Sequence, residues 1–193
     1  MSPAKKAFGL DFSLYLGDPD DGVEQVASTE ILGNFDSYKD RLPFDDGIYG
    51  RLTLEVGSKS VLDAIPDPIA KMLISLVRVL PYVLEGEPET ALMQESEHGF
   101  LLEPNGENVL FSVFSGSDAY EPDDYLVEAE SLPLIEFGDQ LVKIGQRLVD
   151  VFKKYDGDAR DAEALEDLEQ VLDVAQDAVK SARLKDEHGI RHH

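Results

Sequence analysis

Carboxylate side chains are the groups in this sequence with the greatest capacity for chemistry. They can bind cations, pair with lysine and arginine, or work in pairs as general acid and base. Between Val79 and Val142, 64 residues contain no lysine or arginine but fifteen carboxylates, namely Glu85, Glu87, Glu89, Glu95, Glu97, Glu103, Glu107, Asp118, Glu121, Asp123, Asp124, Glu128, Glu130, Glu136 and Asp139.

The charge of the whole chain points the same way. It has 17 basic and 40 acidic residues, for a formal net charge of −23. Such a surplus repels nucleic acid and anionic membranes, and it attracts basic surfaces over roughly a Debye length, about 8 Å at physiological salt. We therefore expect a basic protein partner and no direct binding to nucleic acid or membrane.

The first candidate site is an acidic loop between Gly116 and Asp124, together with Tyr125 directly after it. Its acids are interleaved with two tyrosines, in the order Asp118, Tyr120, Glu121, Asp123, Asp124 and Tyr125. Tyrosine offers contact area and a hydroxyl, and carboxylates pair with guanidinium, so this composition is typical of a surface that binds lysine or arginine. A polar loop with its tyrosines folded onto the core explains the residues equally well.

The second candidate site is an acidic stripe on the last predicted helix. The face opposite its apolar seam carries Glu163, Glu166, Gln170, Asp173 and Asp177, with Asp167 and Glu169 beside them. Like charges four residues apart destabilise a helix slightly, so local stability does not favour this pattern. Two plain explanations stay open: a salt-adapted host, or neutralisation by Lys143, Arg147, Lys153 and Lys154 on the preceding helix.

Catalytic and metal-binding motifs are largely missing. The chain has no cysteine, no phosphate-binding glycine loop, no Gly-x-Ser-x-Gly and no His-Glu-x-x-His. His98 is the one histidine outside the C-terminal tail. The run from Asp156 to Asp161 imitates the start of an EF-hand but has Arg160 at the fifth position and no glycine at the sixth. We predict no metal, no cofactor and no enzyme activity, although a hydrolase built on an unrecognised carboxylate pair stays an alternative.

Alternating and helical periods predict the elements that carry these acids. Alternation over 8–16 predicts a strand, followed by strands over 23–32 and 48–56 in a three-stranded meander. Asp67 and Pro68 signal the start of a central helix that Pro81 kinks or shortens and Gly86 ends. Further strands are expected over 90–94, 99–103, from Val109 and over 125–130, with a tight turn at Asn105-Gly106.

Two helices should complete the fold. Apolar residues spaced three and four apart run from Leu134 to Tyr155 and from Leu165 to Ala182, which predicts an antiparallel helical hairpin laid across the sheet. The fold class is α+β, with one antiparallel sheet of about six or seven strands and three helices. We divide the chain into a disordered N-terminus (1–6), one domain (7–185) and a polar tail (186–193) that ends in a possible tag remnant.

The compartment follows from what the chain lacks. It has neither cysteine nor a long apolar leader, and its longest apolar stretch, 69–84, is interrupted by Lys71, Arg78 and Pro81. This apolar stretch is also shorter than the ~20 residues that a membrane span requires. The sequence therefore predicts a soluble, cytoplasmic protein.

In layout and charge the chain resembles the small acidic immunity proteins of bacterial toxin–immunity systems. The resemblance covers the C-terminal half: the hairpin from Phe100 to Phe111, the acidic strand after it and the helix that bears Phe137. It implies a non-enzymatic antitoxin that binds a basic toxin domain, often a nuclease, and occludes its active site. It carries over no binding residues. An inhibitor that mimics DNA and binds a nucleic-acid-binding protein is the main alternative.

Overall fold

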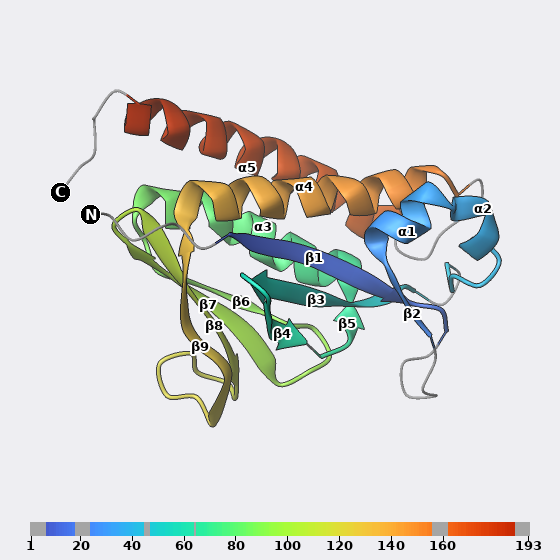
Figure 1. Cartoon of the computed structure of the whole chain (residues 1–193), viewed down its shortest axis with the longest axis horizontal. Helices are drawn as coiled ribbons and strands as arrows, with labels where there is room; N and C mark the ends of the chain where they lie inside the picture. The colour runs from blue at the N-terminus through green and yellow to red at the C-terminus, as the bar shows by residue number, and fades with distance from the viewer. Residues whose placement is uncertain (1–6, 18–23, 45–46, 64, 156–161, 188–193) are drawn as a thin grey trace.

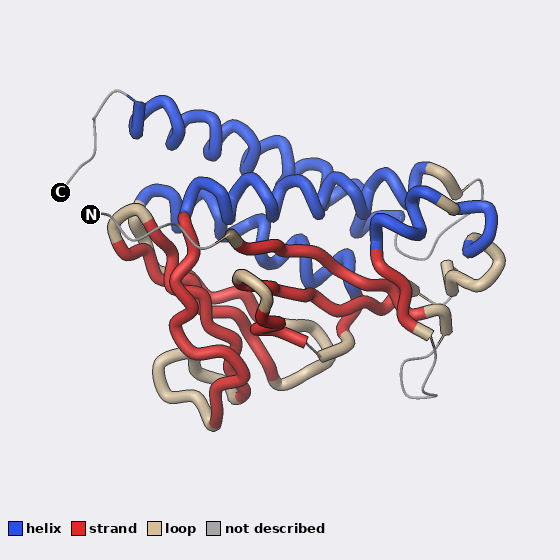
Figure 2. Tube along the Cα trace, in the orientation of Figure 1, coloured by secondary structure: helices blue, strands red, loops and turns tan. Residues whose placement is uncertain are grey.

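The computed structural model describes residues 7–17, 24–44, 47–63, 65–155 and 162–187. The expectations for 1–6, for the turn at 18–22, for the EF-hand-like run at 156–161 and for 188–193 lie outside these ranges. The helices gather along one side of the molecule and the strands along the other (Figures 1 and 2). The α+β class is confirmed.

Sheet A is built from the N-terminal third of the chain. Its strands are β1 (Phe8–Tyr15), β2 (Gln25–Ala27), β3 (Tyr49–Val56), β4 (Lys59–Asp63) and β5 (Asp67–Pro68). They run in the order β2-β1-β3-β4, with β5 paired to β3, and every pairing is antiparallel. Alternate residues of β1 and β3 are buried because a strand that covers a core directs every second side chain inward.

Sheet B is a four-stranded antiparallel meander. Its strands are β6 (Glu89–Leu92), β7 (His98–Asn105), β8 (Asn108–Ser115) and β9 (Asp124–Pro133). The β7–β8 turn is formed by Gly106 and Glu107, and of these two only Gly106 has a positive φ, 63°. β9 is irregular opposite β8, and Ala129 there has a φ of 49°. Sheet B contains no lysine or arginine.

Five helices are present in the described ranges: α1 (Ser28–Gly33), α2 (Phe35–Tyr38), α3 (Ile69–Glu85), α4 (Leu134–Lys153) and α5 (Ala162–Glu187). α3 is central, with nine buried residues and packing against α4, α5, β6 and β7. α4 and α5 form the predicted antiparallel hairpin, and α5 packs on α3 and α4 as an outer layer (Figure 1). One hydrophobic core joins both sheets to the helices.

Two glycines of α4 allow α5 to come close. A Cβ at Gly138 would lie 3.0 Å from Val179 Cγ2, and one at Gly145 would lie 2.7 Å from Leu172 Cδ2. A side chain at position 145 would collide with Leu172 unless that leucine moved aside. The hairpin depends on these two missing side chains as well as on its apolar seams.

Several sequence predictions need correction. In the described ranges the strands form two sheets with nine strands in all, because the five strands before α3 pair only with one another and the four strands after it do the same. The first three strands are no meander, since β1 lies between β2 and β3. The predicted strand 23–32 keeps strand structure only at 25–27 and then becomes α1, where Ser28 and Ile31 are buried. α5 also continues through residues 186 and 187, which were assigned to the tail.

Asp67 does not cap α3. The residue before the helix is Pro68, and no side-chain hydrogen bond caps it. Asp67 is fully buried, and its two carboxylate oxygens accept hydrogen bonds from the backbone N–H groups of Gln94 (3.0 Å) and Glu95 (2.9 Å). The side chain therefore ties β5 of sheet A to the β6–β7 loop of sheet B. At the other end, Gly86 ends α3 as predicted, with a φ of 99°, and the helix passes through Pro81.

Candidate partner-binding surfaces

The acidic loop is an ordered connection between β8 and β9. Asp118 Oδ1 accepts a hydrogen bond from the backbone N–H of Tyr120 (2.9 Å), and Asp124 Oδ1 accepts one from that of Tyr125 (2.8 Å). The backbone N–H of Asp123 donates to the Ser115 carbonyl at 2.9 Å. Asp118, Glu121, Asp123 and Asp124 are all exposed, and no described cation forms an ion pair with them.

The loop is fixed to the outer face of sheet B by a small apolar cluster. Leu101, Phe114 and Ala119 are buried there, and Tyr125 packs against them. The Phe114 ring can pack closely over Gly99 because this glycine has no side chain: a Cβ at that position would lie 2.7 Å from Phe114 Cζ. Tyr120, by contrast, is 64% exposed. The two explanations of the loop thus each fit one tyrosine, since Tyr125 folds back onto the sheet and Tyr120 faces solvent.

The acidic stripe lies on the outer surface of α5, where Glu163, Glu166, Asp167, Asp173 and Asp177 are exposed. Asp177 pairs with Lys180 at 3.3 Å. The other four make no ion pair with a cation in the described ranges. The structure thus leaves most of the stripe bare on the side that faces away from the core.

The cations of α4 and its C-terminal end do little to neutralise the stripe. Lys153 pairs with Glu169 at 2.5 Å, and this hydrogen bond and the nearby negative charge raise the pKa of Lys153 above 10.5. Arg147 instead binds Asp11 on β1 (2.6 Å), and Lys154 donates to the Leu32 carbonyl (2.8 Å). A groove of about 500 Å³ between α4 and α5 is lined by both Lys143 and Asp173, which form no ion pair with each other.

The two predicted acidic surfaces do not form one site. The acidic loop lies at the end of sheet B where β8 leads into β9. Helix α5 covers the opposite side of the molecule, beyond α3 and α4 (Figure 1). A compact partner that contacts the loop would therefore not contact the stripe at the same time. The role of each as a binding site stays a prediction.

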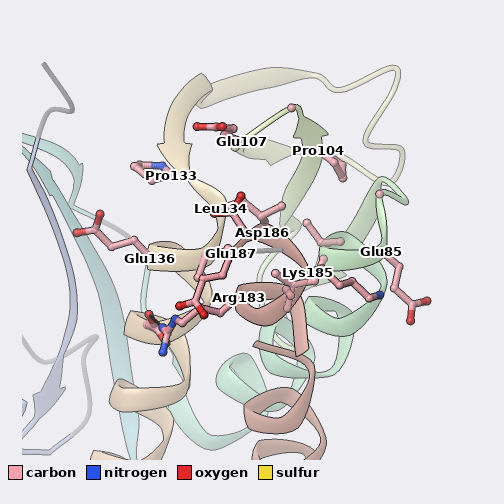
Figure 3. Close-up of a pocket in the computed structure, with 17 residues that line it drawn as sticks. Glu85, Pro104, Glu107, Pro133, Leu134, Glu136, Arg183, Lys185, Asp186 and Glu187 are labelled. Atoms are coloured by element: carbon pink, nitrogen blue, oxygen red, sulfur yellow. Dashed lines mark hydrogen bonds and ion pairs between the residues drawn. The ribbon is translucent and has the colours of Figure 1, made fainter. Parts of the chain in front are cut away.

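A third acidic feature, which the sequence reading missed, is a groove of about 670 Å³ at one end of the helices (Figure 3). We call it the end groove. The last turn of α3, the β7–β8 turn, the first turns of α4 and the last turn of α5 enclose it. Its apolar lining includes Val83, Leu84, Leu134, Ile135 and Ala182, and its charged residues are Glu85, Glu107, Glu136, Asp139, Asp186, Glu187, Arg183 and Lys185.

Sequence position gives one signal for this groove. Glu85 comes before the glycine that ends a helix, Glu107 sits in a tight turn, and Glu136 opens the next helix. Each of these acids therefore lies where a helix or strand begins or ends. The N–H of Leu134 donates to the carbonyl of Glu107 at 2.9 Å, which fixes the turn against α4. That the three ends meet could not be read from the sequence, because it depends on contacts between distant segments.

Signs of catalysis or metal binding are sparse in the described ranges. No group of three or more His, Asp or Glu side chains is arranged there to hold a metal ion. His98 is half-buried, and its Nδ1 is enclosed without a hydrogen-bond partner in the described part of the chain. A general base needs a partner that orients it. Among the same residues, no helix has both the length and the apolar character needed to cross a membrane.

Fold and surface together define a class: an α+β protein with two antiparallel sheets, a helical hairpin and acidic surfaces at separate places. Comparison with family models, with curated proteins and with solved structures gives no match. Function must therefore be argued from the surfaces themselves.

Proposed function

We propose that this chain is a non-enzymatic, acidic protein-binding module, an immunity protein that acts in the cytoplasm by binding a basic toxin domain and occluding it. The acidic loop is the main contact. The observation that carries the proposal is that four exposed carboxylates and the exposed ring of Tyr120 sit on a loop with defined backbone bonds, and that no described cation forms an ion pair with these acids.

The ordered backbone of the acidic loop favours a role of its acids in partner contact over a role in solubility alone. A partner that binds preformed carboxylates loses less conformational entropy than one that must order a free loop. Asp118 and Asp124 each use one carboxylate oxygen to accept a hydrogen bond from a backbone N–H, which leaves the other oxygen available to an arginine or lysine. The loop therefore offers fixed acceptors of the kind that charge-assisted hydrogen bonds require.

The stripe on α5 supports the same function at longer range. Because it faces a different direction from the loop, we assign it to attraction of a basic partner before contact. Such steering raises the association rate and weakens as salt increases. The exposed helical row of acids is also the feature that favours the DNA-mimic alternative, in which the stripe itself would be the contact.

Association kinetics test the proposal. The partner is captured from the source organism and purified, and its association rate is measured with the wild type, with Asp118→Lys/Asp123→Lys/Asp124→Lys, and with the matched control Glu163→Lys/Glu166→Lys/Asp173→Lys. The loop variant should associate at least about tenfold more slowly and dissociate faster, because it loses contacts as well as steering. The stripe variant should lose association rate only.

Two results would contradict the loop assignment. Unchanged kinetics in the loop variant would remove the loop from the interface. Loss of binding in the stripe variant alone, with duplex DNA competing in a length-dependent way for the partner, would favour the DNA mimic.

A further inference from the structure

The end groove combines an apolar floor with a carboxylate rim, and the proposal above does not use it. We propose that it binds a short basic segment of a partner protein, whose side-chain stems lie on the floor and whose cationic head groups reach the rim. The inference does not depend on the acidic loop, which lies at the other end of sheet B (Figure 1).

Size and lining limit the kind of ligand. A volume of about 670 Å³ lies in the range of sites that hold small ligands, so a few side chains fit and a broad protein surface does not. Val83 and Leu134 are buried beneath it, and Leu84, Ile135 and Ala182 are half-buried. Lysine and arginine match such a lining, because their methylene stems cover apolar surface while their charged ends stay near solvent.

The charge of the end groove limits the kind of ligand further. Six carboxylates line the groove against two cations. One of these cations, Arg183, is already bound by Asp139. Glu85, Glu136 and Glu187 are exposed and form no ion pair with any cation in the described ranges. The groove therefore has a local surplus of negative charge that its own residues do not cancel.

The second cation of the groove, Lys185, indicates where a cationic group of a ligand would lie. Lys185 extends from α5 toward Glu85 on α3, on the opposite side from Arg183 (Figure 3). No ion pair joins Lys185 to a described acid. The C-terminal ends of α3 and α5 border the groove and favour positive charge there, whereas the N-terminal end of α4, which also borders it, favours negative charge. A partner's arginine can take the place toward which Lys185 reaches.

Short peptides test the idea without knowledge of the partner. The probes are fluorescein-labelled Arg-Leu-Leu-Arg, Arg-Ser-Ser-Arg and Glu-Leu-Leu-Glu amides, and binding to the full chain is measured by fluorescence anisotropy. Arg-Leu-Leu-Arg should bind at least about tenfold more tightly than either of the others, because it alone satisfies both floor and rim. Amide NMR shifts should change most near Leu84, Gly106 and Ile135.

Three variants locate the site. Glu85→Gln/Glu136→Gln/Glu187→Gln should weaken Arg-Leu-Leu-Arg binding about tenfold, while the control Glu163→Gln/Glu166→Gln/Asp173→Asn, with the same change in charge, should weaken it less than about twofold. Lys185→Met should tighten binding, because it removes the internal competitor. Circular dichroism confirms that each variant is folded.

Other outcomes would overturn the proposal. Equal binding of both arginine peptides, or equal losses in the groove and control variants, would mean attraction by diffuse charge only. Equal binding of Arg-Leu-Leu-Arg and Glu-Leu-Leu-Glu would mean an apolar ligand. Neither outcome bears on the acidic loop, so the proposed function would stand.

Discussion

Sheet A and sheet B use carboxylates in opposite ways. In sheet A, Asp11 binds Arg147 and Ser28, and Asp67 is buried with two backbone N–H donors. In sheet B and its loops, the acids are mostly exposed, and Asp118 and Asp124 of the acidic loop accept hydrogen bonds from nearby backbone N–H groups. The difference lies in the donors, because Arg147 of α4 and two backbone N–H groups of the β6–β7 loop reach the acids of sheet A, while sheet B has no lysine or arginine of its own.

This contrast separates structural acids from surface acids. An acid that stabilises the fold has a donor fixed by another element, and its loss leaves that donor unsatisfied. An exposed acid without such a donor adds repulsion from neighbouring like charges to the folded state. Substitution of each kind should therefore change stability in opposite directions.

The largest effect is expected at Asp67. Asp67→Asn keeps the size but places an NH₂ group where one oxygen accepts a hydrogen bond from Gln94 or Glu95. The free energy of unfolding should fall by about 1–3 kcal/mol, because the site is fully buried. Urea denaturation measures this. A change below about 0.5 kcal/mol would show that the link between the sheets does not stabilise the fold.

A smaller loss is expected at Asp11. Asp11→Asn removes the negative charge that binds Arg147 and keeps a group that can accept from Ser28. Because the Asp11 side chain is 37% exposed, solvent screens the pair, and the loss should be about 0.5–1 kcal/mol. The double variant with Arg147→Met should cost less than the sum of the single changes. Strict additivity would mean that the two residues do not interact.

A change of the opposite sign is expected in the acidic loop. Asp118→Asn/Asp123→Asn/Asp124→Asn keeps side-chain oxygens that can accept from the backbone N–H groups of Tyr120 and Tyr125, and it removes three like charges. Stability should stay within about 0.5 kcal/mol of wild type or rise slightly, and the rise should vanish at high salt. A clear loss in urea denaturation at both salt concentrations would reclassify these acids as structural.

The smallest effect is expected for Lys153→Met, and it should depend on pH. The hydrogen bond from Lys153 to Glu169 raises the pKa of Lys153 above 10.5 in the folded state. The folded state therefore holds this proton more tightly, so the pair stabilises fully below pH 10.5 and less as pH rises through the folded pKa. Wild type and variant should converge in thermal melts at alkaline pH. A gap that widens there would contradict the pairing.

Local patterns in the sequence were sufficient for some elements and not for others. Alternation from Phe8 predicted β1, Gly86 predicted the end of α3, and the seams from Leu134 and Leu165 predicted the helical hairpin. The division into two sheets depends on which strands pair over long distances, and alternation does not encode that. α1 was missed because six residues are too few for a helical period to stand out.

The candidate sites show the same limit. Composition alone indicated the acidic loop and the stripe, and the structure confirms that their acids are exposed. Sequence could not show that Arg147 turns toward Asp11 and away from α5, because that choice is made in the folded molecule. The end groove was missed for the same reason, since Glu85, Glu107 and Glu136 meet only after α3, sheet B and α4 have packed.

The close approach of α5 to α4 at Gly138 and Gly145 is set by shape, whereas the affinity of the end groove for a cation is set by charge. Ionic strength acts on the second and hardly on the first. The cell's salt level can therefore tune how firmly a basic ligand is held while the helices that form the groove keep their spacing.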